Sequence, residues 1–279
     1  MTATEPSSSP SSSPGRGISR TFIPLDSPLS WGCSGRGWNC CTDKDIPLRP
    51  YDVHRLARAL DRPARALLDD GLFTLEWDGY GILGGWLATR PYEETRTACV
   101  FYGETRDAEG NLVAGLCNAH AGRPEACRGF PFQRHADWSA HPDAAADRTA
   151  MQVSDCGSCA LARPTTARAV MLDNDLEAYW RADDAYRAVV QYLHKSGLAN
   201  LGGSAYRRLP LPPDARFAFW AAMFTHPGSY ADALTAILDA TDALISASDL
   251  TPAELGGPGA PIPRPDVHAL LDPARAVLP

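Results

Sequence analysis

The sequence predicts an α-rich, irregular α+β fold in which a cysteine-rich core with short strands is followed by a C-terminal helical cover. Three observations lead to this prediction. All eight cysteines lie between Cys33 and Cys159. Residues 72–102 combine glycine, aromatic and β-branched residues with turn pairs, as short strands do. The chain beyond residue 166 carries long segments in which apolar residues recur with helical spacing.

The first 20 residues are dominated by Ser and Pro, as in "MTATEPSSSPSSSPGRG". This composition buries too little apolar area to offset the entropy lost on ordering, so residues 1–20 are predicted to form a disordered tail. The segment has neither the basic region nor the apolar region of a secretory signal peptide. We therefore expect the protein to be cytoplasmic.

Two helices are expected next. "IPLRPYDVHRLARALD" predicts a helix that begins near Pro50, because proline is tolerated in a first turn, and Val53 and Leu56 then share one face. "PARALLDDG" predicts a second, shorter helix that ends at Gly71. The short strands follow directly after this glycine.

The region beyond the last cysteine is predicted to be helical. Its longest apolar pattern covers residues 173–195 and stops at Gly197. "PPDARFAFWAAMF" and "SYADALTAILDATDALISA" predict two further helices. The expected organisation is a cysteine-rich metal-binding region over 21–165, a helical region over 166–250 that packs on it, and an extended Pro/Gly-rich tail over 251–279.

Charge and hydropathy exclude two classes of partner. The 279 residues carry a formal net charge of −7. Nucleic acids and anionic membranes are bound through basic faces, so we expect no nucleic-acid partner and no membrane partner. No apolar run approaches the roughly 18 residues of a membrane span.

The cysteines indicate a metal site. The cytosol keeps thiols reduced, so eight cysteines in one half of a cytoplasmic chain are expected to be metal ligands or redox groups. Zinc and iron–sulfur clusters both accept four cysteine ligands, and spacing alone does not choose between them. Eight thiolates are enough for one or two four-cysteine centres, such as two 4Fe–4S clusters, that would staple the core. The candidate metal ligands are Cys33, Cys40, Cys41, Cys99, Cys117, Cys127, Cys156 and Cys159.

Cys40 and Cys41 are adjacent, which raises a geometric question. Neighbouring side chains point to opposite faces of a strand and diverge by about 100° in a helix. We therefore expect the two thiols to serve two different centres, or one of them to be unligated. His120, three residues after Cys117, is an alternative ligand, although a surface or core histidine is the more ordinary interpretation.

The segment "GRPEACRGFPF" surrounds Cys127 with restrictive and charged residues. Its prolines limit the backbone, and Phe130 and Phe132 are expected to exclude water from the site. Arg123 and Arg128 are predicted to be cofactor-binding residues, because their guanidinium groups can donate hydrogen bonds toward anionic sulfur. An ordinary well-packed loop remains the alternative interpretation.

Together, "CSGRGWNCC", "ACVFYGE", "LCNAHAGRPEACRGFPF" and "DCGSC" resemble the YkgJ-type CxxCxxCC family of zinc- or iron-chelating proteins. The resemblance spans residues 33–159, and its most specific part is the RP-x-x-CR-x-FPF portion from Arg123 to Phe132. The sequence departs from the family pattern at the start, where Cys33 alone precedes the adjacent pair and the family usually has two cysteines. The flagellin lysine N-methylases contain a similar cysteine-rich region.

Three functions follow from these observations. The leading interpretation is a cytoplasmic metalloprotein that binds iron–sulfur or zinc. The resemblance to the lysine N-methylases implies a protein- or peptide-modifying enzyme with a protein or peptide substrate as an alternative, although no glycine-rich S-adenosylmethionine loop is found. The C-x-x-C pair of Cys156 and Cys159 could instead belong to a thiol–disulfide oxidoreductase, but no strand precedes it.

Overall fold

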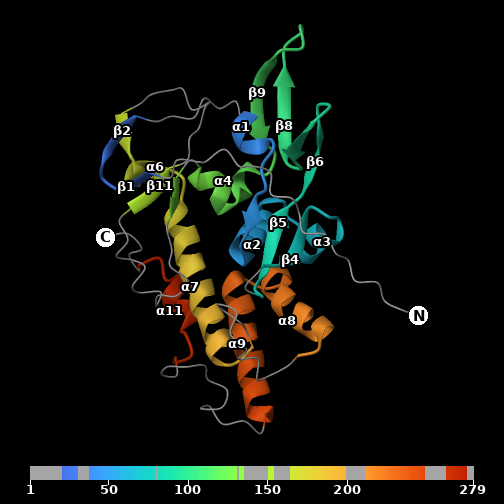
Figure 1. Ribbon diagram of the computed structural model, residues 1–279, viewed down its shortest axis with the longest axis vertical. Helices are drawn as coiled ribbons and strands as arrows, with labels where there is room; N and C mark the ends of the chain where they lie inside the picture. Colours follow the sequence, from blue (N-terminus) through green and yellow to red (C-terminus); the bar gives the residue numbers. More distant parts are fainter. Residues whose placement is uncertain are drawn as a thin grey trace, which may run out of the picture.

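The computed structural model describes residues 21–30, 38–78, 81–130, 132–134, 150–153, 164–198, 211–248 and 262–274. Within these ranges the fold is α-rich, irregular α+β, as predicted, with small antiparallel sheets toward one end and long helices toward the other (Figure 1). The predicted disordered tail over 1–20 lies outside the described residues. No helix in the described ranges is both long enough and apolar enough to cross a membrane.

The cysteine-rich half consists of short elements. In chain order they are β1 (Thr21–Pro24), β2 (Pro28–Ser30), α1 (Trp38–Cys41), β3 (Pro47–Leu48), α2 (Pro50–Ala59), α3 (Ala64–Asp69), β4 (Phe73–Trp77), β5 (Leu83–Leu87), β6 (Thr89–Tyr92), β7 (Arg96–Cys99), β8 (Tyr102–Arg106), β9 (Leu112–Cys117), the 3₁₀ helix η1 (His120–Gly122), α4 (Glu125–Gly129), β10 (Phe132–Arg134) and β11 (Ala150–Val153). The two predicted helices and the predicted short strands are therefore confirmed.

The strands of the described residues pair in five small antiparallel sheets. Their orders are β1-β11-β10, β12-β2, β3-β5-β4, β6-β7 and β8-β9, where β12 is Pro164–Thr166. The β8–β9 hairpin projects at the top of Figure 1, and its register places Tyr102 opposite Cys117 at the base. The sheets β1-β11-β10 and β12-β2 join the first described residues to strands more than 100 positions later.

The helical half contains α6 (Ala167–Asp173), α7 (Leu176–Lys195), α8 (Pro213–Thr225), α9 (Tyr230–Ala247) and α11 (Val267–Leu271). The helix predicted from residue 173 begins instead at Leu176. Asp175 takes a left-handed conformation (φ 57°), which interrupts the helical backbone between α6 and α7. Gly197, at φ 74°, ends α7 as predicted. In the predicted extended tail the described part includes the short helix α11, which packs against α7 and α9.

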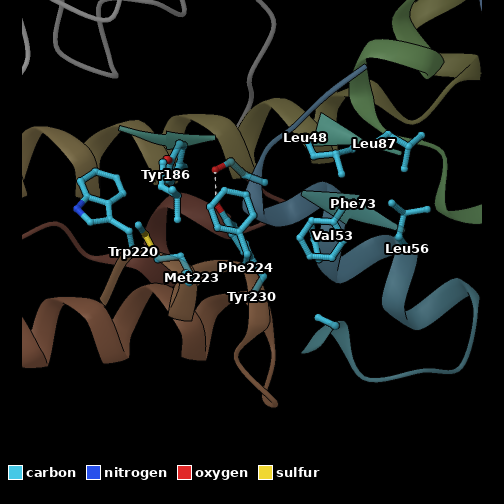
Figure 2. Close-up of a cluster of buried hydrophobic side chains, with 14 of the residues drawn as sticks. Leu48, Val53, Leu56, Phe73, Leu87, Tyr186, Trp220, Met223, Phe224 and Tyr230 are labelled. Carbon is cyan, nitrogen blue, oxygen red and sulfur yellow. Dashed lines mark hydrogen bonds between the residues drawn. The ribbon is translucent and has the colours of Figure 1, made fainter. Parts of the chain in front are cut away.

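One hydrophobic core spans both halves. It includes Leu48, Val53 and Phe73 from the cysteine-rich half, and it continues into buried residues of α7, α8 and α9. Figure 2 shows Leu48, Val53 and Phe73 at one side of this cluster and Trp220 of α8 at the other, with Phe224 labelled between them. A smaller cluster comprises Leu25, Phe132, Ala167, Val170, Met171, Leu176 and Trp180. The helices therefore complete the core on which the cysteine-bearing elements rest.

Candidate metal centre

Five cysteines line one small cavity. Its volume is about 100 Å³, below the roughly 300 Å³ at which pockets begin to hold drug-sized molecules. Most of the remaining lining is apolar. The lining residues are Cys40, Cys41, Ile46, Leu56, Leu87, Cys99, Phe101, Tyr102, Gly115, Leu116, Cys117, His120, Arg123, Pro124 and Cys127.

Four separate elements bring these thiols together. Cys40 and Cys41 end α1, and the next residue, Thr42, forms an isolated bridge with Ala98 of β7, which places α1 beside Cys99. The Cys99 sulfur accepts the backbone N–H of Phe101 at 3.4 Å, so it lies inside the turn that leads to β8. Cys117 is the last residue of β9, and Cys127 lies within α4. A short N-terminal helix and three later segments thus converge on one point.

The adjacent cysteines do not diverge as expected. Their Sγ atoms are 3.9 Å apart, and both side chains line the cavity. Two thiolates on one tetrahedral zinc ion, each about 2.3 Å from the metal, would stand about 3.8 Å apart. The spacing therefore allows Cys40 and Cys41 to share an ion, because α1 is a single short turn at whose end the two side chains can face the same way.

The thiols interact electrostatically. The hydrogen bond between the two sulfurs lowers the pKa of the Cys40 thiol to about 7, and the same hydrogen bond, with burial, raises the pKa of Cys41. Burial raises the pKa of Cys99, Cys117 and Cys127, and for Cys127 the charges of Cys99 and Cys117 add to the effect. Several thiolates in this cavity would therefore repel one another unless a cation compensated them.

The position of Cys127 is set by a buried carboxylate on α2. Asp52 is 2% exposed and accepts two backbone N–H groups, from Arg49 at 2.7 Å and from Glu125 at 2.8 Å. The first bond closes the first turn of α2, and the second fixes the start of α4 directly after Pro124. Cys127 follows within this short helix and its N–H donates to the Pro124 carbonyl at 3.0 Å.

Arg128 holds the same segment from the other side. Its guanidinium donates to the backbone carbonyls of Ala121, Arg123 and Asn174 and to the hydroxyl of Tyr179. It also lies over the Tyr179 ring, 5.2 Å from the centroid. Although predicted to bind the cofactor, Arg128 is outside the cavity lining, and the structure gives its donors protein acceptors.

Arg123 is the arginine that lines the cavity. One of its terminal nitrogens donates to Asn174 Oδ1 at 3.3 Å, and its Nε is buried without a hydrogen-bond partner among the described residues. Burial raises the pKa of Cys127, and the positive charge of Arg123 acts in the opposite direction. The same charge lowers the pKa values of Cys40 and Cys117. A buried donor without an acceptor is unfavourable, so this group is suited to an anionic sulfur.

The remaining predicted site residues lie elsewhere. His120 lines the cavity, although the residue as a whole is exposed. Partial burial lowers its pKa, and the charges of Arg123 and Arg128 lower it further. Phe130 and Phe132 do not line the cavity; Phe132 packs in the smaller hydrophobic cluster, and the water-excluding groups are instead side chains such as Phe101. Cys33, Cys156 and Cys159 lie outside the described residues.

The donor set fits a thiophilic metal in its chemistry. Cysteine is the ligand that zinc and iron–sulfur clusters prefer, and the cavity gathers five of them beside an unsatisfied cationic donor. Among the described residues, no group of three or more His, Cys, Asp or Glu side chains is arranged so that it could hold a metal ion. A complete ligand set therefore requires the thiols to turn toward the ion or the three cysteines outside the described ranges to contribute.

Sequence reasoning missed Asp52 and Tyr179, the two residues that anchor the segment carrying Cys127. Asp52 could have been noticed as an acidic residue in the first turn of a helix that begins with proline. Tyr179 has no local signal, because its partners Arg123 and Arg128 lie more than 50 positions earlier in the chain.

Comparison with known proteins agrees with this geometry. No curated protein and no solved structure gives a significant match. A stretch that carries all five cavity cysteines does match a family model. Residues 32–146 match the CxxCxxCC family, described as a "putative zinc- or iron-chelating domain".

Proposed function

We propose that this protein is a cysteine-cluster metalloprotein that binds zinc or an iron–sulfur cluster through up to eight thiolates. One observation carries the proposal: five cysteines from four separate elements line a single small cavity. Free cysteines scattered through a core would be ordinary small hydrophobes. Their convergence beside the unsatisfied Nε of Arg123 is not explained by packing alone.

Each residue has a distinct role in this proposal. Cys40, Cys41, Cys99, Cys117 and Cys127 are ligands, and Cys33, Cys156 and Cys159 complete the set. The bound metal would supply the positive charge that offsets buried thiolates and would staple four elements together. Arg123 would donate to a ligand sulfur, whereas Arg128 would position the backbone that carries Arg123 and Cys127.

The 3.9 Å between Cys40 Sγ and Cys41 Sγ bears on the kind of centre. Each iron of a four-cysteine 4Fe–4S cluster takes one thiolate, whereas zinc takes several on one ion. The short separation therefore favours zinc, or an iron that carries two cysteines, at the position that this pair serves. A 4Fe–4S cluster would fit better if only one of the two were a ligand.

The cavity favours a binding role over the protein-modifying alternative. It holds only about 100 Å³, and apart from the thiols, His120 and Arg123 its lining is mostly apolar. A substrate pocket beside the centre would need more volume and more polar groups. The oxidoreductase alternative rests on Cys156 and Cys159, which lie outside the described residues, and no described feature favours it.

Metal analysis of anaerobically purified protein tests the proposal. We expect about one equivalent or more of zinc, or of iron with sulfide, per folded chain. Cys127→Ser should lose most of this metal, because serine is a poor ligand for soft metals. Leu116→Ala lines the same cavity without removing a donor and should retain the metal. Folded wild-type protein without metal, or full metal in Cys127→Ser, would contradict the proposal.

A further inference from the structure

A second cavity lies on another side of α2. Its volume is about 490 Å³, within the range of roughly 300–1,000 Å³ that holds small molecules. Its walls come from α2, α7, the first turn of α9 and the end of α11. Leu56 of α2 faces the thiol cavity, whereas Arg55 and Arg58 line this second one, so α2 separates two different sites.

The lining of this cavity is cationic. It contains Arg55, Arg58 and Arg181, and none of the described lining residues is Asp or Glu. The whole chain has an excess of acidic residues, 33 against 26 basic ones. A wall with three arginines and no carboxylate therefore departs from the average surface and is a suitable environment for an anion.

Two of these arginines have no ion-pair or hydrogen-bond partner among the described residues. In the described part of the chain, neither the Arg58 nor the Arg181 side chain has an ion pair or a hydrogen bond. Arg55 lies 3.4 Å from Asp175, whose side chain is 55% exposed, and such an exposed pair is weak. Its guanidinium also packs 5.5 Å from the centroid of the Tyr179 ring, which keeps it at the cavity wall.

The other polar groups of the wall do not replace the arginines. His54 Nε2 is 3.1 Å from the Met223 carbonyl, and burial lowers its pKa, so the ring adds no charge near neutral pH. The N-terminus of α9 is capped within its own first turn, where Asp232 accepts from the Ser229 N–H and the Ser229 side chain accepts from Asp232 N–H. The guanidinium groups are therefore the groups of this wall that would attract an anion.

We propose that this cavity binds a small oxyanion compound carrying phosphate or carboxylate groups. Guanidinium groups present paired N–H donors that match both kinds of oxyanion. The volume leaves room for an organic part beside the charged group, and Tyr51 gives that part an aromatic wall. No cysteine lines this cavity among the described residues, so anion binding here can be tested independently of metal binding by the thiols.

Calorimetric titration of the full chain tests this site. The probes are inorganic phosphate, glycerol 3-phosphate and succinate, at constant ionic strength set with sodium chloride. We expect saturable one-to-one binding of at least one probe with a dissociation constant of about 1 mM or lower. Binding of the phosphates alone would identify a phosphate ligand, and binding of succinate alone would identify a carboxylate ligand; either result supports the site.

Matched variants locate the binding. Arg58→Gln and Arg181→Gln should each weaken it by about tenfold or more, because each removes a charge-assisted hydrogen bond. Arg65→Gln removes the same charge from α3, where Arg65 is 68% exposed and pairs with Asp69, and should bind as the wild type does. Thermal melts of all three variants check folding. No saturable binding of any probe, or equal binding by the wild type and both cavity variants, would overturn the proposal.

Discussion

Asp52 is the single residue on which the placement of the metal-site loop (residues 123–130, which carry Cys127) depends most directly. Its carboxylate accepts N–H bonds from two segments, at Arg49 and at Glu125, while it is 2% exposed. Burial raises its pKa to about 6, because the two hydrogen bonds and the Arg49 charge do not fully offset desolvation. The ionised Asp52 therefore positions two segments but lowers the free energy of unfolding at neutral pH.

This pKa predicts a pH dependence of stability. The folded-state pKa of about 6 lies above the value of about 3.9 in an unfolded chain, so the folded state binds the proton more tightly. The Asp52 contribution to the free energy of unfolding should rise by about 2 kcal/mol as the pH falls from about 7 to about 4. Asp52→Asn should remove this part of the slope in urea denaturation followed across that range.

The comparison needs a carboxylate of ordinary environment as its control. Asp69→Asn is suitable, since Asp69 is exposed and pairs with Arg65 at the surface. Its denaturation is followed across the same pH range, so that only the difference between the two variants is assigned to Asp52. An Asp52→Asn variant with the wild-type slope would show that Asp52 does not carry the raised pKa.

Cys40 and Cys41 give a second prediction at the scale of single residues. Because their sulfurs are 3.9 Å apart in one cavity, Cys40→Ser and Cys41→Ser should remove metal from the same centre. Metal content and absorption spectra of the two variants should therefore change alike. A variant that retained all its metal would show that its thiol is not a ligand, and different spectra would restore the view that the pair serves two centres.

Among the elements, β10 and α7 are joined by a buried ion cluster. Arg134 of β10 lies 2.8 Å from Asp184 of α7, and Arg187 lies 2.5 Å from the same carboxylate. The side chains of Arg134, Asp184 and Arg187 are 7%, 8% and 0% exposed. The strand directly after the metal-site loop is thus held to the longest helix through one shared carboxylate.

Removing that carboxylate should be strongly destabilising. Asp184→Asn removes the buried charge that the guanidinium groups of Arg134 and Arg187 share, and we expect a loss of about 3–5 kcal/mol in the free energy of unfolding. Asp239→Asn, at an ion pair with Arg264 where the Asp239 side chain is 64% exposed, should change it by about 1 kcal/mol or less. Urea denaturation of both variants makes the comparison, and equal losses would contradict the assigned role of burial.

The elements that sequence could predict are those with local signals. The helix α2 begins at Pro50, α7 ends at Lys195, two residues before Gly197, and α9 lies within the predicted segment that starts at Ser229, all as the pattern indicated. The break at Asp175 was missed, because its left-handed backbone has no strong sequence signal. Pairings such as β1 with β11 join distant segments and depend on tertiary packing that periodicity does not contain.

The site was predictable in part for the same reason. Residue type, with the compartment expected from the sequence, indicates cysteines as candidate ligands, and the structure brings five of them to one cavity. The divergence of Cys40 and Cys41 was a wrong expectation, because ideal helix geometry does not describe the end of a single turn. The supporting contacts of Arg128 with Tyr179 could not be predicted, since they join residues 51 positions apart.

At the scale of the whole molecule, the two halves share one core. Val53 and Phe73 of the cysteine-rich half pack in the same cluster as Tyr186 and Val189 of α7. The thiol cavity lies at the border of this cluster, where Cys99 is buried and Cys41, Cys117 and Cys127 are partly buried. Metal removal should therefore loosen the cavity elements first and leave the long helices in place.

Hydrogen exchange with and without a chelator measures this order. In zinc peptides a structural metal site contributes roughly 10 kcal/mol or more to the free energy of unfolding. Loss of the ion should therefore raise hydrogen exchange strongly in residues 38–41 and 112–130. The α7 segment, residues 176–195, should keep most of its protection, because its buried face packs against α9 and α11 as well. A uniform rise along the chain, or no rise at all, would contradict a metal staple at the cavity.

X-ray absorption at the metal edge of anaerobically purified protein tests the central claim most directly, because it reports the atoms bound to the metal. We predict a first shell dominated by sulfur, at about 2.3 Å if the metal is zinc. Iron would be expected with additional sulfide sulfur and a neighbouring iron. A first shell of only nitrogen and oxygen at about 2.0–2.2 Å would place the metal on histidine or carboxylate side chains and would contradict thiolate ligation.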